Sequence, residues 1–180
     1  MVLKHSIFQN TGQSLLVKLS LISINNCTFD NINTEWNGGA LAIKSTVRTD
    51  IISSIFRNSS VRGKGGFIHF HVGDELNIHH CQFYHGRAGD MGGALLFNQI
   101  RKWALMQNCT FRSSSSEQGG AIAILNIKTF LRIHRCNFSS NNATIGGALY
   151  MNSFPLFRQQ ESAFSLDRIK VIIQDCLFTA

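Results

Sequence analysis

The chain of 180 residues is poor in proline, in charge and in long apolar runs. Disorder needs few apolar residues and many charges, but 44% of this chain is hydrophobic and only 15% is charged, so we expect a folded domain over residues 1–180. No run approaches the 18 apolar residues of a membrane helix, and the first residues lack the apolar segment of a signal peptide. With one proline and 15 glycines, turns made by Gly and Asn are expected, which is typical of a β protein.

A pair of adjacent glycines recurs five times in phase. The second glycine advances by 27 residues at each copy, through Gly39, Gly66, Gly93, Gly120 and Gly147. A fixed period of this length indicates a solenoid. Helical solenoids need apolar residues at a spacing of 3.6, and no unit keeps that spacing for a dozen residues. The repeat therefore predicts stacked β-coils.

A second motif, a small residue followed two positions later by phenylalanine, keeps the same phase. Its cysteines are Cys27, Cys81, Cys109, Cys136 and Cys176, and its phenylalanines include Phe29, Phe56, Phe83, Phe111 and Phe138. Each unit also holds two apolar doublets, such as Ile22/Ile24 and Leu41/Ile43, which alternate as strands with one buried face do. A corner is expected near Asn26. We predict an all-β, right-handed, single-stranded parallel β-helix with three sheets and about six coils of about 27 residues.

The cysteine column has three interpretations. Cysteines that alternate with inward phenylalanines are expected to pack in the core as small hydrophobes. Cys109 and Cys136 would be neighbours about 5 Å apart, so a disulfide between them is possible. A metal site is a third possibility, although the sequence has no C-x-x-C pair. Core packing is the favoured interpretation, and no metal or cofactor is predicted.

Several polar residues one repeat apart should stack into columns. Asn31 and Asn58 continue an asparagine ladder that starts at Asn10, and such amides stabilise tight turns. Opposite charges also fall in columns, namely Glu35 with Arg62, and Arg48 with Glu75 and Lys102. Each such pair contributes about 0.2 to 1 kcal/mol. These columns predict structural roles.

One column places like charges together. Asp90 and Glu117 are one repeat apart at a turn, and paired carboxylates can serve acid/base chemistry or bind cations. A solvated turn is the simpler interpretation. His69 and His71 flank the inward Phe70 and should point outward, and no acidic residue joins them at a ligand-like position. Surface histidines are therefore expected.

The repeat is interrupted once, by about thirteen residues after Gly147. This insertion spans about 153–166, and its Phe154, Phe157 and Phe164 form a candidate binding loop; the alternative is that they fold back to cover the end of the stack. Neither end of the chain looks like a cap, so we expect a segment of a longer solenoid. The formal charge of +7 is dispersed over the units, and nucleic acid is not a predicted partner.

The combined motif resembles the repeat of chlamydial polymorphic membrane proteins. The residues that carry the resemblance are Cys27-Thr-Phe29-Asp-Asn31 with Gly38-Gly39-Ala40-Leu41, and Cys136-Asn-Phe138-Ser-Ser-Asn141 with Gly146-Gly147-Ala148-Leu149. It covers essentially the whole chain and implies an adhesin-like passenger, extracellular or on a cell surface.

The expected function is a non-catalytic interaction module, a rigid monomeric rod that contacts a protein or glycan on a cell surface without inserting into a membrane. One alternative is a polysaccharide lyase or glycoside hydrolase that uses Asp90 and Glu117. The other is a structural spacer.

Overall fold

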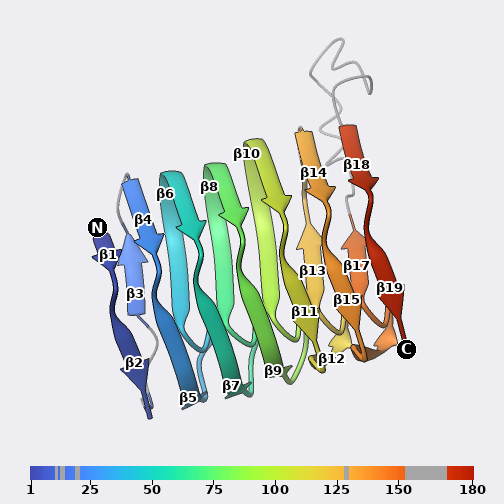
Figure 1. Ribbon diagram of the computed structural model, residues 1–180, viewed down its shortest axis with the longest axis horizontal. Helices are drawn as coiled ribbons and strands as arrows, with labels where there is room; N and C mark the ends of the chain where they lie inside the picture. Colours follow the sequence, from blue (N-terminus) through green and yellow to red (C-terminus); the bar gives the residue numbers. More distant parts are fainter. Residues whose placement is uncertain (11, 13–14, 19–20, 128–129, 153–169) are drawn as a thin grey trace, which may run out of the picture.

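A computed structural model describes residues 1–10, 12, 15–18, 21–127, 130–152 and 170–180. These residues form strands, turns and bends, with no helix among them. The strands run parallel and stack as a β-solenoid of about five turns with a repeat of about 27 residues, close to the six coils expected (Figure 1). The termini lie at opposite ends of the stack.

The strands form two hydrogen-bonded sheets. Sheet A holds ten strands: β1 (Val2–Lys4), β3 (Leu15–Lys18), β4 (Leu21–Asn25), β6 (Leu41–Ile52), β8 (Ile68–His79), β10 (Leu95–Gln107), β13 (Ile122–Leu125), β14 (Phe130–His134), β17 (Leu149–Asn152) and β18 (Lys170–Gln174). Sheet B holds nine: β2 (Ile7–Gln9), β5 (Thr28–Thr34), β7 (Ile55–Val61), β9 (Gln82–Ala88), β11 (Thr110–Arg112), β12 (Ser115–Gln118), β15 (Asn137–Ser139), β16 (Asn142–Ile145) and β19 (Leu177–Thr179).

The number of sheets differs from the three expected. The apolar doublet that follows the glycines and the next doublet lie on the same long strands β6, β8 and β10. Hydrogen-bonded pairing continues through the bend between the doublets, where Thr46 of β6 pairs with Gly73 of β8. Since paired positions recur on both sides of Thr46 within one strand, two predicted strands become one in β6, β8 and β10.

A bulge in β10 absorbs an extra residue. Gly73 pairs with Ile100, 27 positions on, whereas Glu75 pairs with Trp103, 28 positions on. A β-bulge places two residues opposite one and leaves the rest of the ladder in register. The apolar columns therefore stay aligned although the spacing between the cysteines varies.

The core is a stack of identical side chains. Phe8, Phe29, Phe56, Phe83, Phe111, Phe138 and Phe178 stack face to face, with centroids 4.8 to 5.0 Å apart and interplanar angles of 3 to 12°. The ring spacing equals the spacing of neighbouring strands, about 4.8 Å, so the backbone ladder sets the ring geometry. Phe67 replaces the usual alanine and is also fully buried. A Cβ at Gly86 would lie 2.6 Å from the Phe67 ring, so that glycine makes room for it.

The cysteines stabilise a corner. The residue before each motif has a positive φ of 49 to 54°, Asn26 among them, as expected. The next side chain donates a hydrogen bond to the carbonyl two residues earlier, at 2.8 to 3.4 Å in Ser6, Cys27, Ser54, Cys81, Cys109, Cys136 and Cys176. A thiol and a hydroxyl both supply this donor from a small side chain. That shared role explains why serine replaces cysteine in two coils.

The double glycine solves two steric problems. The first glycine of each pair has a positive φ of 66 to 71°, which glycine adopts without penalty. The second glycine has no such φ. A Cβ at Gly39, Gly66, Gly93 or Gly120 would collide with the carbonyl oxygen of the second glycine one coil further along. The coils can stack at this point only without a side chain.

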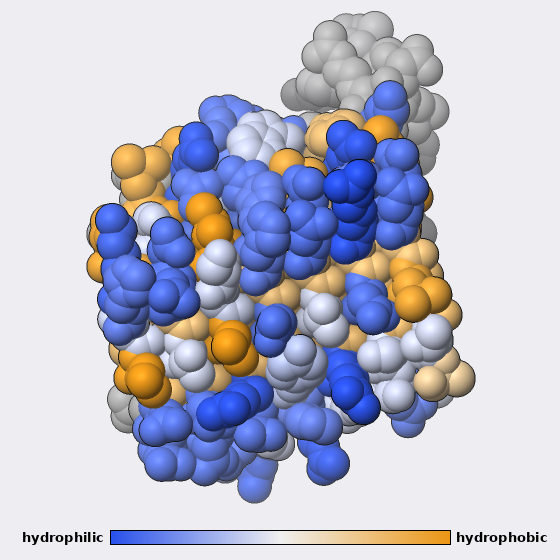
Figure 2. Space-filling view, viewed as in Figure 1, coloured by the Kyte–Doolittle hydropathy of each residue, from blue (hydrophilic) through white to orange (hydrophobic). Residues whose placement is uncertain are grey.

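Exposed large apolar side chains concentrate in the first and last coils. Val2, Ile7, Leu16 and Leu21 lie near one end, and Ile145, Met151, Val171, Ile173, Leu177 and Phe178 near the other. Of the described residues between them, only Trp36 and Val47 are comparably exposed large apolar side chains. The face in Figure 2 is mostly hydrophilic, with hydrophobic colouring near both ends and in smaller areas between them.

Candidate functional site

The structure places Asp90 and Glu117 on neighbouring coils, as the repeat predicts. The Glu117 amide donates to the Asp90 carbonyl oxygen at 3.0 Å. Asp90 Oδ2, however, forms an ion pair with Lys64 Nζ at 3.1 Å, and Glu117 is exposed. Neither carboxylate lines either of the two hollows described below. The described residues thus provide a solvated turn around these two acids.

The proposed binding loop, with Phe154, Phe157 and Phe164, lies outside the described residues. The five cysteines are free, and all except Cys176 are buried. Burial raises the pKa of Cys109, and the neighbouring Cys109 thiol together with burial raises the pKa of Cys136. Because the thiolate is the nucleophile and the metal ligand, these thiols are suited to packing. Core packing, the favoured interpretation, is what the structure shows.

The histidines do not converge on a ligand set. His69 is half-buried and His71 is exposed, and their ring centroids are 5.8 Å apart. His134 lies two coils beyond His79, with Gln107 between them. Among the described residues, no three His, Cys, Asp or Glu side chains gather as a metal site would require.

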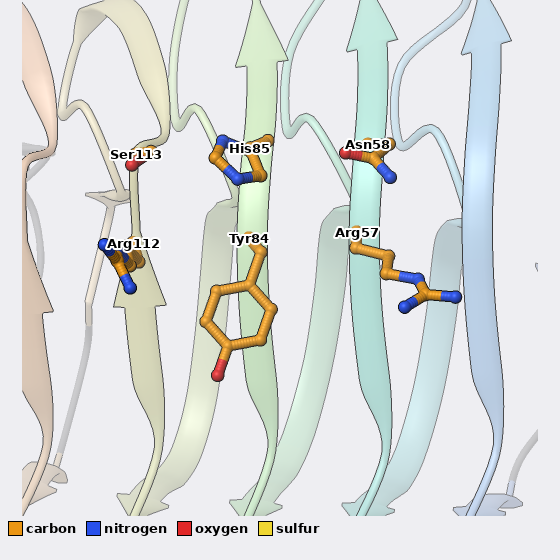
Figure 3. A pocket seen from close by; sticks show the side chains of 6 residues that line it. All are labelled: Arg57, Asn58, Tyr84, His85, Arg112 and Ser113. Atoms are coloured by element: carbon orange, nitrogen blue, oxygen red, sulfur yellow. The ribbon is translucent and has the colours of Figure 1, made fainter.

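A hollow of about 520 Å³ opens on the outer face of sheet B; we call it the Tyr84 shelf (Figure 3). Its lining residues form two parallel rows, Arg57, Tyr84 and Arg112 in one and Asn58, His85 and Ser113 in the other. The first row follows directly after inward phenylalanines, so alternation along the strand turns it outward. The second row has positive φ values of 54 to 56° and marks the next corner.

The two arginines of the shelf differ in their electrostatic surroundings. Arg57 Nη2 lies 3.0 Å from Asp30 Oδ2, and Asn58 donates to the other oxygen of Asp30 at 2.9 Å. Burial alone would raise the pKa of Asp30, but the hydrogen bonds from Asn58 and Arg57 outweigh it and hold that pKa below its usual value. Arg112 is exposed and has no ion-pair partner among the residues that the structure describes. Arg112 thus differs from Arg57, whose charge is partly balanced by Asp30.

Tyr84 occupies the centre of the shelf. Its strand neighbours are Arg57 on one side and Arg112 on the other, one coil away in each direction. Its hydroxyl donates to Gln82 Oε1 at 3.2 Å, which holds the side chain along its own strand. The ring and its two flanking cations thus form a row parallel to the rod axis (Figure 3).

A second hollow, the Trp36 groove, has a volume of about 600 Å³ and lies over sheet A. It is lined by Leu16, Trp36, Asn37, Ala42, Ile43, Lys44, His69 and His71. Trp36 is 74% exposed and Leu16 58% exposed. Burial, with the charges of His71 and Lys64, lowers the pKa of His69 to about 4, so its imidazole is neutral at neutral pH.

Neither hollow was predicted from the sequence. A signal for the shelf is the residue after each stacked phenylalanine, which reads Gln9, Asp30, Arg57, Tyr84, Arg112, Ser139 and Thr179. An aromatic residue between two arginines is conspicuous in that row. The signal for the groove is weaker, because its walls come from a turn and from strands of several coils.

The chain matches no protein-family model, no curated protein and no solved structure. The described residues include no helix able to cross a bilayer. The shelf supplies cations, an aromatic ring and hydrogen-bonding groups on a regular backbone, which together suit it to binding.

Proposed function

We propose that the chain is a non-catalytic, adhesin-like interaction module of an extracellular or cell-surface protein. In this proposal a rigid rod presents the Tyr84 shelf to a protein or glycan on another surface. The observation that carries the proposal is the row of Arg57, Tyr84 and Arg112 on a continuous parallel sheet.

Rigidity supports this proposal physically. The three residues of the row stand on strands β7, β9 and β11, whose inward phenylalanines stack at 4.8 to 4.9 Å. Side chains on such a framework lose little conformational freedom of the backbone when a partner binds. Modest contacts can then add up along the rod.

The test is a binding measurement with intact cells and a printed glycan panel. The labelled chain should bind a subset of these surfaces, and the double variant Tyr84→Ala/Arg112→Gln should lose most of that binding. Arg62→Gln is the matched control, because Arg62 is exposed, pairs with Glu35 at 3.0 Å and lies outside both hollows. A chain that binds nothing would support a structural spacer instead.

The enzymatic alternative has its own readout. Release of new reducing ends or unsaturated sugars from a polysaccharide, abolished by Asp90→Asn/Glu117→Gln, would identify a glycoside hydrolase or lyase and contradict the proposal. We expect no such release, because Asp90 is paired with Lys64 and Glu117 faces solvent. The same double variant should bind cells as well as the unchanged chain does.

A further inference from the structure

We infer that the Tyr84 shelf binds an acidic polysaccharide that lies along the rod axis. This inference rests on the proposed function and names its ligand class. Arg112 and the free donors of Arg57 would bind acid groups of the polymer, and the Tyr84 ring would pack against the sugar ring between them.

The spacing of the cations is the first argument. Arg57 and Arg112 are two coils apart, with Tyr84 in register between them. Neighbouring strands are about 4.8 Å apart, so these backbone positions are separated by roughly 9.6 Å. The Arg57 side chain extends away from Tyr84 toward Asp30 of the preceding coil, so its guanidinium lies beyond its own backbone position (Figure 3). The row thus offers two widely spaced cations, which suits a polymer whose acid groups alternate with neutral units.

The same spacing disfavours nucleic acid. Each strand of DNA carries a phosphate about every 3.4 Å along the helix axis, which is several phosphates for the length of this row. Asp30, beside Arg57, adds a negative charge at the end of the row, where a densely charged strand would be repelled. A sparsely charged polymer can place neutral hydroxyls there.

The chemistry of the shelf side chains is the second argument. Guanidinium groups bind carboxylates and sulfates through two parallel hydrogen bonds, and Arg112 has no competing ion pair among the described residues. Arg57 carries five N–H donors, of which the contact with Asp30 engages only part. Tyr84 offers a flat apolar face, which suits the C–H face of a pyranose.

The second row supplies hydrogen bonds beside the aromatic ring. His85 and Ser113 stand next to Tyr84 and Arg112 in sequence and line the same hollow. Both lie at corners with positive φ, where their positions are set by the backbone ladder. Sugar hydroxyls both donate and accept, and imidazole and hydroxyl groups complement them.

The experiment uses the whole chain and hyaluronan oligosaccharides, which carry one carboxylate in each disaccharide. The matched ligand is the same oligosaccharide with its carboxylates methyl-esterified. We expect binding to the native oligosaccharide, and at least about tenfold weaker binding to the ester, because loss of a charge-assisted contact costs about that factor. Binding should weaken as salt rises.

The variants separate the shelf from general charge. Arg112→Gln should weaken binding about tenfold and flatten its salt dependence, whereas Arg62→Gln removes the same charge elsewhere and should leave affinity within twofold. Tyr84→Ala should weaken binding, and Tyr84→Phe, which keeps the ring, should retain it. Circular dichroism of each variant should match that of the unchanged chain, since all three side chains are on the outer surface.

Several outcomes would overturn the inference. Equal binding of acid and ester, equal effects of the two arginine variants, or tighter binding to a single-stranded oligodeoxynucleotide would each do so. Cell binding that survives hyaluronidase and chondroitinase but not protease would point to a protein partner, leaving the proposed function intact and this inference wrong. Absence of binding to any cell or glycan would instead contradict the proposed function itself.

Discussion

The inward side chains of this rod repeat from coil to coil, whereas the outward side chains do not. Inside, one solution recurs in every coil: seven stacked phenylalanines and a thiol or hydroxyl at each corner. Outside, the residue after each stacked phenylalanine changes from Gln9 to Asp30, Arg57, Tyr84, Arg112, Ser139 and Thr179. Because the backbone repeats and the outer side chains do not, the coil determines the shape and the outer rows determine what the shape can bind.

Removing one ring from the middle of the stack should have the largest effect. Phe83→Ala opens a cavity beside the rings of Phe56 and Phe111 and should lower the free energy of unfolding by about 3 to 5 kcal/mol. Phe178→Ala, at a side chain that is 48% exposed, should cost less than half as much. Urea unfolding followed by circular dichroism measures both. Equal losses would mean that the stack is not the source of stability.

The second-largest effect is expected at the second glycine of each pair. A Cβ at Gly93 would collide with the Gly120 carbonyl oxygen, so Gly93→Ala should destabilise the chain by about 1 to 3 kcal/mol. Gly147→Ala is the matched control. Among the described residues, the nearest atom to a Cβ at Gly147 would be the Asn141 carbonyl oxygen, at 3.6 Å. Gly147 also has no positive φ. Thermal unfolding should rank the two, and a reversed order would refute the explanation given for the double glycine.

The corner donor can be tested by an exchange that the chain already uses. Cys81→Ala removes the hydrogen bond from Cys81 Sγ to the His79 carbonyl and should cost about 1 kcal/mol. Cys81→Ser restores a donor, as in Ser54, and should be the more stable variant in chemical denaturation. If serine proves worse than alanine, apolar packing rather than the hydrogen bond determines the residue at this corner.

The last expected effect, absent at neutral pH, is a pH dependence at an outward side chain that is partly buried. The pKa of His69 is about 4 in the folded chain, below its ordinary value of 6.5, because of burial and the nearby His71 and Lys64. Between these values the unfolded chain binds the proton and the folded chain does not, so stability should decline as pH falls from about 6.5 to about 4.

His69→Gln should flatten that part of the profile of unfolding free energy against pH. His85→Gln, at an exposed histidine of the shelf, serves as the control. A slope that is the same in all three proteins would show that His69 is not its source.

Most of the architecture could be predicted from the sequence, because a repeat reports the same environment several times. Gly93 and Phe83 each have equivalents one coil away on both sides, so chance resemblance is excluded and their roles are visible. The predicted number of sheets, three instead of the two observed, was wrong for a physical reason. Side-chain alternation shows which residues point inward, but hydrogen-bond continuity through Thr46 and Gly73 decides whether two segments share a strand.

The outer surface was predictable only in part. The Glu35–Arg62 pair forms as the column indicates, at 3.0 Å. Arg48 instead pairs with Asp50 of its own strand at 2.8 Å, because two positions along a strand share a face. The predicted asparagine ladder forms only in part. Asn31 donates to Asn10 at 2.6 Å, but Asn58 donates to Asp30 instead of to Asn31. The partner of each side chain depends on which rotamers meet across coils, and the spacing of residues in the sequence does not determine those rotamers.

The bulge in β10 has a consequence for how such a chain can change. One residue is gained between Gly73–Ile100 and Glu75–Trp103, and it is lost again between Arg87–Ser115 and Met91–Gln118. The length of a coil is therefore corrected within a single turn, and an insertion does not propagate as a phase error along the rod. Mutations that lengthen or shorten the outer surface can accumulate coil by coil while the buried columns stay in phase.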